Sequence, residues 1–294
     1  MIRVNRIAYV VLESPDLAAS IAHYTEVMGL TLVDKDAGSA YLTTTVDHHN
    51  IVLRKGAEAR CAAIGFQTPV GTDIGDYAKQ IESHSIGVKR QKDSQPHIAE
   101  TVLFEDSKGT RIEVFAEHKP VSNPYAKSGI VPNKLGHVAY CVADLDAAVK
   151  FYSEVLGFRV SDWMGDFFAF MRCSADHHTI NFIKTGKDRM HHVAFELRDW
   201  GHVKDACDLL YRFKTPLVWG PVRHGIGHNI SIYHRNADGQ FIEHFCELDR
   251  MDEGAGALEP RPTHRDYPQK PKVWTDIMEA ASVWGIPPPA GFLE

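Results

Sequence analysis

Short apolar runs alternate with longer amphipathic stretches along most of the chain. Residues 138–142 form a β-branched and aromatic run typical of a strand, whereas residues 144–156 have apolar positions at helical spacing. Gly157 follows that stretch and is a typical residue at the end of a helix. The same criteria predict strands over residues 167–172, 179–184, 191–197, 229–234 and 241–247, and a second helix over residues 203–213.

Segments of the first half recur in the same order in the second half. The corresponding segments are residues 6–9 and 137–140, 23–30 and 151–158, 47–49 and 176–178, 63–66 and 192–195, and 109–113 and 239–243. Similarity that keeps five segments in order rarely arises by chance, so the chain contains an internal duplication. Each half is therefore predicted to be α+β and to contain two βαβββ units.

The length of 294 residues is typical of two domains. We expect one domain over residues 1–118 and a second over residues 135–248, joined by a linker at residues 119–134 that contains three prolines and a glycine. Residues 249–294 form a tail rich in Gly and Pro, with a short helix expected near residues 275–284. This tail is expected either to cover one module as a lid or to be solvated.

Composition excludes several classes of protein. With 44% hydrophobic and 24% charged residues and a net charge of −6, the chain is typical of a globular protein and is not expected to bind nucleic acid. Its apolar runs are far shorter than the roughly 20 residues of a membrane-spanning helix, and its N-terminus does not resemble an export signal. Five cysteines without CxxC spacing favour reduced thiols. We therefore expect a cytoplasmic protein without membrane contact.

Three residues distinguish the second half from the first. The second half has His137, His192 and Glu243 at the positions where the first half has Arg6, Ala63 and Glu113. Two imidazoles and a carboxylate on one side of an ion leave the other positions open, which suits a non-haem Fe(II) that binds both an organic substrate and O2. Zinc, manganese or nickel could bind the same donors. The first half is not expected to hold a metal, and Glu113 is expected to lack partners there.

Four motifs in the second half resemble one known family. They are GHVAY at residues 136–140, RMHHVAF at residues 189–195, GPVRHG at residues 220–225 and the pair Ile242-Glu243. Together with the two-module arrangement, these motifs are similar to the type I extradiol catechol dioxygenases of the vicinal oxygen chelate superfamily. The resemblance runs from about residue 3 to residue 248, and its motifs are more specific in the second half. It implies two tandem vicinal-oxygen-chelate domains, each a pair of βαβββ modules forming an open β-barrel around a metal cavity.

The resemblance also implies roles for individual residues. His137, His192 and Glu243 would hold Fe(II), with Mn(II) as an alternative. The acid-base histidine would lie within residues 176–179, where the spacing favours His178 over His177; the alternative for His178 is a solvent-facing strand residue.

Two more side chains would act on the substrate or its intermediates. His224 would bond a substrate hydroxyl or orient its loop, and Tyr233 would hydrogen-bond the reacting oxygens; the alternative for Tyr233 is a core aromatic residue. Among the other histidines, His191 is expected to face away from the site because neighbouring strand residues alternate. His228 and His234 are expected at the surface.

The implied reaction is extradiol cleavage of a catechol-type ring by O2, giving a hydroxymuconic-semialdehyde-type product in aromatic degradation. The partners would be the catechol, O2 and further copies of the chain in a homo-oligomer. Two alternatives belong to the same superfamily. One is a metal-dependent isomerase or lyase resembling glyoxalase, whose ligands come from both modules; the other is a small-molecule-binding protein without catalysis.

Overall fold

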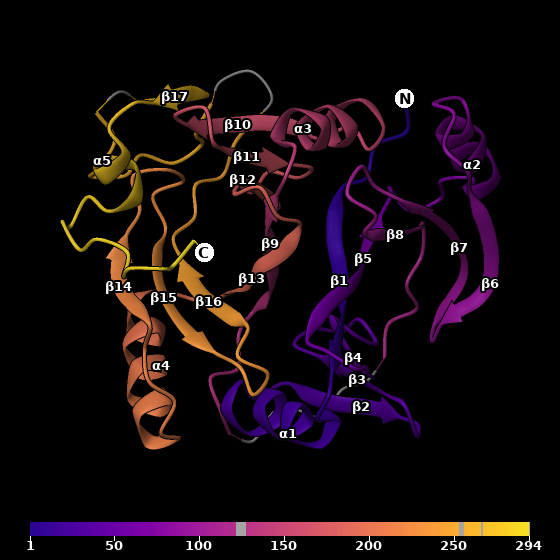
Figure 1. Ribbon diagram of the computed structural model, residues 1–294, viewed down its shortest axis with the longest axis horizontal. Helices are drawn as coiled ribbons and strands as arrows, with labels where there is room; N and C mark the ends of the chain where they lie inside the picture. Colours follow the sequence, from indigo (N-terminus) through magenta and orange to yellow (C-terminus); the bar gives the residue numbers. More distant parts are fainter. Residues whose placement is uncertain (122–127, 253–255, 266, 294) are drawn as a thin grey trace. The chain divides into compact units, whose positions relative to one another are not determined.

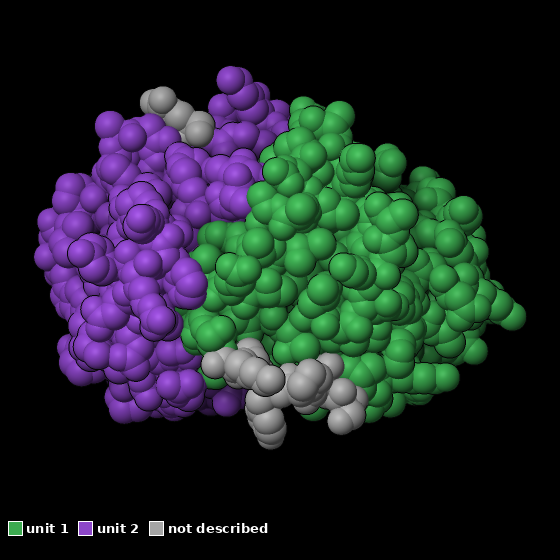
Figure 2. Space-filling model, turned by 90° about the horizontal axis from the view of Figure 1, so that it is seen from below, with its two compact units in different colours: residues 1–135, 150–158 green, residues 136–149, 159–294 purple. Residues whose placement is uncertain are grey.

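The computed structural model describes residues 1–121, 128–252, 256–265 and 267–293. It divides into two compact units, residues 1–135 with 150–158 and residues 136–149 with 159–294 (Figure 2). Parts of the predicted linker (122–127) and of the predicted tail (253–255, 266 and 294) lie outside the described residues. One of the boundaries between the units falls within helix α3 (Leu145–Glu154).

The first half of the chain contains two βαβββ modules in one eight-stranded sheet. The sheet has the strand order β2-β3-β4-β1-β5-β8-β7-β6. The first module consists of β1 (Arg6–Ser14), α1 (Leu17–Ala22), a π-helical turn η1 (His23–Val27), β2 (Thr31–Lys35), β3 (Ser39–Thr43) and β4 (Ile51–Lys55). The second consists of β5 (Arg60–Gln67), α2 (Ile74–Glu82), β6 (Lys89–Gln95), β7 (Ile98–Glu105) and β8 (Arg111–Phe115).

The second half repeats this plan and adds the tail. Its nine-stranded sheet has the order β14-β15-β16-β13-β9-β12-β11-β10-β17, and both sheets curl into open half-barrels (Figure 1). The third module consists of β9 (Lys134–Val142), α3, β10 (Arg159–Met164), β11 (Phe168–Arg172) and β12 (Ile180–Lys184). The fourth consists of β13 (Arg189–Glu196), α4 (Trp200–Arg212), β14 (Trp219–Arg223), β15 (Ile230–Arg235) and β16 (Phe241–Cys246). The α+β prediction and the prediction of two βαβββ units in each half are confirmed.

Three strands of the second half were not identified in the sequence: β10 and β14 of its two modules and one strand of the tail. Strand β14 contains Pro221, which cannot donate a ladder hydrogen bond, but β14 is an edge strand with a register shift, where proline is tolerated. Strand β10 contains the buried Asp162, which breaks its apolar pattern. Two partners of Asp162, Lys272 and Trp274, come from the tail, more than one hundred residues away, so no local pattern reveals them.

Strand register confirms the duplication. Strands β5 and β8 pair in parallel with Gly65 opposite Glu113, and β13 and β16 pair in parallel with Ala194 opposite Glu243. The two carboxylates therefore occupy the same place in the two halves. His192 lies two residues before Ala194 on β13, so its side chain is on the same face of that strand as the side chain of Ala194.

The tail adds a strand and a short helix to the second half. Strand β17 (Lys272–Trp274) pairs in parallel with β10, beside which it lies in Figure 1, and α5 (Ile277–Ala281) follows it. Asp162 accepts hydrogen bonds from Lys272 N and Trp274 Nε1, both at 2.8 Å. The pairing of β17 with β10 and these two hydrogen bonds attach the tail to the edge of the sheet. Among the described helices, none is long and apolar enough to span a membrane.

Gly65 is predicted to be required for packing in the first half. A Cβ added at Gly65 would lie 2.4 Å from ring atoms of the buried Tyr9, so Gly65→Ala forces a core ring to move. Overpacking of this kind costs about 1–3 kcal/mol, which urea denaturation would measure as a lower free energy of unfolding. Gly87→Ala is the control, because its Cβ would meet no atom within 4 Å. Equal stability of the two variants would contradict this account of the packing.

Candidate active site

Three buried donors converge inside the second half. His137 on β9, His192 on β13 and Glu243 on β16 have exposed fractions of 1%, 5% and 2%. The Nε2 atoms of His137 and His192 lie 3.0 and 3.1 Å from Glu243 Oε2, and 3.2 Å from each other. Two imidazole nitrogens and one carboxylate oxygen at these separations can all coordinate one first-row divalent ion. The donor set therefore fits the predicted metal.

The second carboxylate oxygen of Glu243 is held by neighbouring side chains. Glu243 Oε1 accepts hydrogen bonds from Ser231 Oγ at 2.6 Å and from Asn229 Nδ2 at 3.1 Å. Although burial alone would raise the pKa of Glu243, the attraction of His137 and His192 holds it well below its ordinary value. The carboxylate is thus ionised and oriented with Oε2 toward the two imidazoles.

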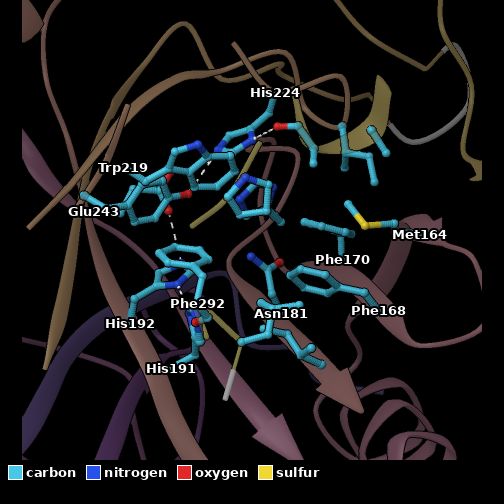
Figure 3. Close-up of a pocket in the computed structure, with 18 of the residues that line it drawn as sticks. Met164, Phe168, Phe170, Asn181, His191, His192, Trp219, His224, Glu243 and Phe292 are labelled. Carbon is cyan, nitrogen blue, oxygen red and sulfur yellow. Dashed lines mark hydrogen bonds and ion pairs between the residues drawn. The ribbon is translucent and has the colours of Figure 1, made fainter. Parts of the chain in front are cut away.

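His191 sets the proton position of its neighbour His192. His191 Nε2 donates to the carbonyl oxygen of Phe292 at 2.6 Å, and its Nδ1 lies 2.7 Å from His192 Nδ1. Burial lowers the pKa of His191 to about 3, so the ring is neutral and its Nδ1 must accept the proton of His192 Nδ1. The lone pair of His192 Nε2 is then directed at the metal position. The expectation that His191 faces away is wrong, since it lines the same cavity (Figure 3).

A second pair of adjacent histidines has the same arrangement. His177 Nε2 donates to Asp162 Oδ2 at 3.3 Å, and His177 Nδ1 lies 3.1 Å from His178 Nδ1. With the proton of His177 Nε2 on that bond, His177 Nδ1 can accept a hydrogen bond from His178 Nδ1, which leaves the Nε2 lone pair of His178 free. His178 lines the cavity, with its ring centroid 4.3 Å from that of His137, whereas His177 does not line it.

The protonation of His178 is set by its surroundings. Burial lowers the pKa of His178 well below its ordinary value, and repulsion from His137 and His177 adds to this shift. His178 is 3% exposed and its counterpart His49 is fully buried, so the solvent-facing alternative for His178 is wrong. A neutral imidazole is therefore available at the cavity wall to accept a proton.

His224 and Tyr233 also line the cavity. His224 Nδ1 donates to the carbonyl oxygen of Ala281 at 2.6 Å, so His224 Nε2 accepts from the Tyr233 hydroxyl at 3.0 Å. Burial lowers the pKa of His224 and raises the pKa of Tyr233 well above its ordinary value. Trp219 stacks on Tyr233 with ring centroids 5.3 Å apart. The pair thus presents a neutral histidine and a protonated phenol.

The tail closes part of this cavity. The cavity has a volume of about 740 Å³, including the space at its mouth, and its wall includes Ile277, Ala281 and Phe292 of the tail. The prediction placed the tail either over a module or in solvent, and the described residues of the tail lie over the fourth and third modules. Two histidines of the site, His191 and His224, depend on tail carbonyl groups for their hydrogen bonds.

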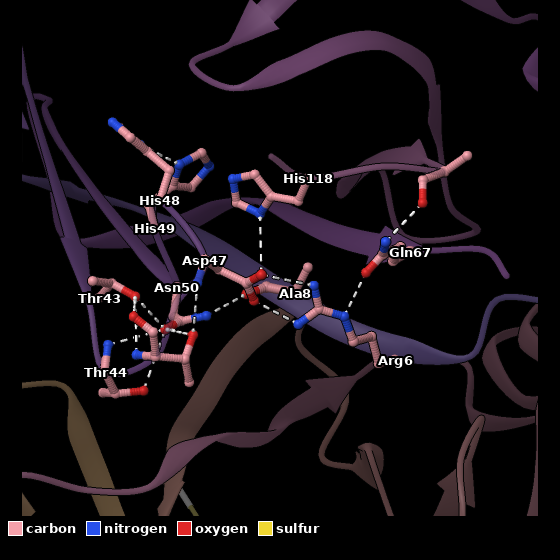
Figure 4. A network of polar contacts seen from close by, with 12 residues as sticks. Arg6, Ala8, Thr43, Thr44, Asp47, His48, His49, Asn50, Gln67 and His118 are labelled. Carbon is pink, nitrogen blue, oxygen red and sulfur yellow. Dashed lines mark hydrogen bonds and ion pairs between the residues drawn. The ribbon is translucent and has the colours of Figure 1, made fainter. Parts of the chain in front are cut away.

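The matching position in the first half holds no donor set of this kind. Arg6, the counterpart of His137, forms an ion pair with Asp47 at 2.6 Å and bonds Gln67 at 2.5 Å (Figure 4). Glu113 bonds the Tyr9 hydroxyl at 2.6 Å, Gln95 Nε2 at 2.9 Å and Arg111 at 2.5 Å. The expectation that Glu113 lacks partners is wrong, because polar and cationic side chains replace the two imidazoles.

A second group of potential metal ligands lies nearby in the second half. His228 Nδ1 and His264 Nε2 lie 2.7 and 3.1 Å from Asp249 Oδ2, and Arg261 Nε lies 3.5 Å from the other oxygen of that carboxylate. Arg261 places a positive charge beside the Asp249 carboxylate. The group connects residues 261–264 to the segment that follows β16. His228 and His234 are 1% and 0% exposed, so the expectation that they are surface residues is wrong.

Several residues around the site were not identified from the sequence. Ser231 and Asn229 precede Tyr233 on or beside β15, and strand alternation places Ser231 on the same face as Tyr233. This alternation could have identified Ser231 from the sequence. Phe292 carried no such signal, because its partner His191 lies 101 residues away. Asp162 carried none either, because the bond from His177 joins residues that share no strand or helix.

Comparison with known proteins identifies relatives over both halves. The family model described as the Glyoxalase/Bleomycin resistance protein/Dioxygenase superfamily matches residues 6–114 and 134–244. A metapyrocatechase of Pseudomonas sp. (strain CF600) is 28% identical over 264 residues, covering 83% of this chain and 86% of the relative. An iron-dependent extradiol dioxygenase of Rhodococcus jostii (strain RHA1) is 24% identical over 268 residues, covering 83% of this chain and 89% of the relative.

Solved structures share the fold of both halves. A Mn(II)-bound glyoxalase from Novosphingobium aromaticivorans has a TM-score of 0.86 at 27% identity, covering 97% of this chain and 92% of that one. The homoprotocatechuate 2,3-dioxygenase of Brevibacterium fuscum, in complex with 3,4-dihydroxyphenylacetate, has a TM-score of 0.86 at 24% identity. The match covers 99% of this chain and 92% of that one. The duplicated βαβββ fold and the match over both halves agree: the chain belongs to the Glyoxalase/Bleomycin resistance protein/Dioxygenase superfamily.

Proposed function

We propose that this protein is an extradiol dioxygenase that opens a catechol-type ring with O2 beside the two hydroxyl groups. The observation that carries the proposal is the convergence of His137, His192 and Glu243 at the wall of a largely apolar cavity that also presents His178 and Tyr233. Relatives named as a metapyrocatechase and as an extradiol dioxygenase support it. The product would be a hydroxymuconic-semialdehyde-type acid.

The two imidazoles and the carboxylate would hold Fe(II). Iron is named for the Rhodococcus jostii relative and Mn(II) for the Novosphingobium aromaticivorans structure, so Mn(II) is the alternative ion. When bound, a ferrous ion would supply adjacent open positions for the two catechol oxygens and for O2, and a path for electrons between them. Glu243 and His192 are already arranged as donors, so little reorganisation is required of the protein.

The residues around the ring would control proton transfer. The neutral His178 would accept the proton of a substrate hydroxyl at Nε2 and later return it, because its Nδ1 proton is committed to His177. Asp162 holds His177 in the tautomer that this requires. The pKa of Tyr233 is raised well above its ordinary value, so Tyr233 keeps its proton and donates it to His224 Nε2. The hydroxyl oxygen of Tyr233 would then accept a hydrogen bond from a substrate hydroxyl. The tail would limit access of water.

A metal-dependent isomerase or lyase is the second candidate, and one observation favours it. One of the solved structures with this fold is named a Mn(II)-bound glyoxalase. The donor set of this chain lies wholly in the second half, and Arg6 is paired with Asp47 in the first, which favours the dioxygenase. Homo-oligomer formation and a cytoplasmic location are also proposed, on the sequence alone.

The proposed reaction predicts oxygen-dependent ring opening. After anaerobic loading with Fe(II), the protein should bind one iron per chain, consume O2 in step with catechol and form a yellow product. Metal analysis, an oxygen electrode and absorbance would measure the three quantities. Iron binding without O2 uptake on any catechol, together with isomerisation of a thiol adduct of an oxoaldehyde, would support the second candidate instead.

The two corresponding glutamates should differ in their effect on metal binding. Glu243→Gln removes the charged donor shared by both imidazoles and should weaken iron binding by at least about 100-fold, more than typical losses from outer partners. Glu113→Gln should leave iron per folded chain unchanged and lower the free energy of unfolding by about 1–3 kcal/mol, since Glu113 bonds Tyr9 and Arg111. Equal loss of iron in both variants would show that the donor set is misassigned.

His178 and His192 should separate proton transfer from metal binding. His178→Asn should keep iron, because three donors remain, and should lower kcat by about 10²–10⁴-fold. His192→Asn should lose iron. Metal analysis and steady-state kinetics distinguish the two results. A His178 variant that loses its iron, or that turns over at the normal rate, would rule out the acid-base role of His178. If only His177→Asn keeps iron and loses activity, His177 is the acid-base residue in place of His178.

A further inference from the structure

The part of the cavity away from the donor set is lined by apolar side chains. Met164, Phe168, Phe170 and Ile183 come from the third module, and Ile277 comes from the tail. The Phe168 and Phe170 rings stack with centroids 4.2 Å apart, and Phe170 belongs to a buried cluster with Met164. Figure 3 shows these rings on the side of the cavity opposite Glu243 and Trp219. A substrate group that extends from the metal position would therefore contact hydrocarbon.

The cavity wall offers no cation to a charged substituent. Among the described residues that line it there is no Lys or Arg, and Asn181 and Asn229 are neutral. Both ring nitrogens of His224 are already engaged, by the carbonyl oxygen of Ala281 and by the Tyr233 hydroxyl. A carboxylate that is buried without a partner is strongly disfavoured in proteins. We therefore expect the cavity to bind catechols with an anionic substituent more weakly than uncharged ones.

The lining of the cavity also extends beyond the donor set. The same cavity is lined by Glu243 and His192 and by Phe168, Phe170 and Ile277, which belong to the third module and the tail. A substituent on a ring held at the donor set would therefore meet apolar side chains.

We propose that the preferred substrate is an uncharged catechol with an apolar alkyl or aryl substituent, which packs against Phe168, Phe170 and the tail residue Ile277. The inference rests on the proposed function, whose site it deepens. The substituent would displace poorly held water from the apolar wall, and its burial would contribute to affinity in proportion to its area. The tail thereby becomes part of the specificity of the site as well as of its closure.

Anaerobic binding tests the proposal separately from turnover. Titration calorimetry of the iron-loaded protein would compare catechol, 3-propylcatechol and 4-propylcatechol. Each buried methylene contributes about fourfold to affinity, so the better of the two propylcatechols should bind about 10-fold to 60-fold more tightly than catechol. The matched pair of 3,4-dihydroxyphenylacetate and its methyl ester isolates the charge, and the acid should bind at least about tenfold more weakly than the ester.

One variant locates the contact. Phe168→Ala should remove most of the gain given by the propyl group and leave the affinity for catechol itself nearly unchanged. Phe213→Ala is the control, because Phe213 is also half-buried but lies at the end of α4 outside the cavity lining. If Phe168→Ala does not fold, Phe168→Leu keeps the core filled and should reduce the gain in part.

The outcomes separate this inference from the proposed reaction. Equal or tighter binding of the acid than of its ester would overturn it, as would equal affinities for catechol and both propylcatechols. Catechols that bind in the expected order but are never opened by O2 would overturn the proposed reaction and leave the apolar specificity standing. Ring opening by O2 together with tighter binding of the acid would support the proposed reaction and overturn the apolar specificity.

Discussion

A buried neutral imidazole carries one proton, and the partner of that proton decides what the other ring nitrogen can do. His191 gives its proton to the carbonyl of Phe292, His177 gives its proton to Asp162, and His224 gives its proton to the carbonyl of Ala281. In each case the opposite nitrogen becomes an acceptor for a neighbour that lines the cavity. The orientation of the metal donor, the proposed base and the phenol thus follows from three acceptors outside the donor set.

Much of this arrangement could be predicted from the sequence, because it depends on position within repeated strands. The duplication placed His137, His192 and Glu243 at equivalent points of similar strands, and parallel pairing of β13 with β16 brings two of them together. The pairing of Asp162 with the tail and of His191 with Phe292 could not be predicted. Those contacts join segments about 100 residues apart and carry no periodic pattern. The buried His228 and His234 were misjudged because histidine in polar surroundings is typical of a surface.

The two halves show how one fold can keep or lose a donor set. In the first half an arginine stands at the first imidazole position, and the equivalent glutamate is neutralised by Arg111 and hydrogen-bonded by Tyr9. The buried carboxylate is retained in both halves, since removing it would leave cationic or polar partners unsatisfied. In the first half, charged and polar partners therefore surround the equivalent carboxylate in place of the two imidazoles.

The dependence of His191 and His224 on tail carbonyls has a consequence for biosynthesis. A chain made from its N-terminus contains all three proposed metal donors once residue 243 has been added, but the hydrogen-bond acceptors at residues 281 and 292 follow later. Until then His192 has no fixed tautomer and Tyr233 has no oriented partner. The orientation of His192 and of Tyr233 is therefore completed only after the tail has been made. Removal of Phe292 alone would take away the acceptor for His191 while leaving every proposed ligand in place.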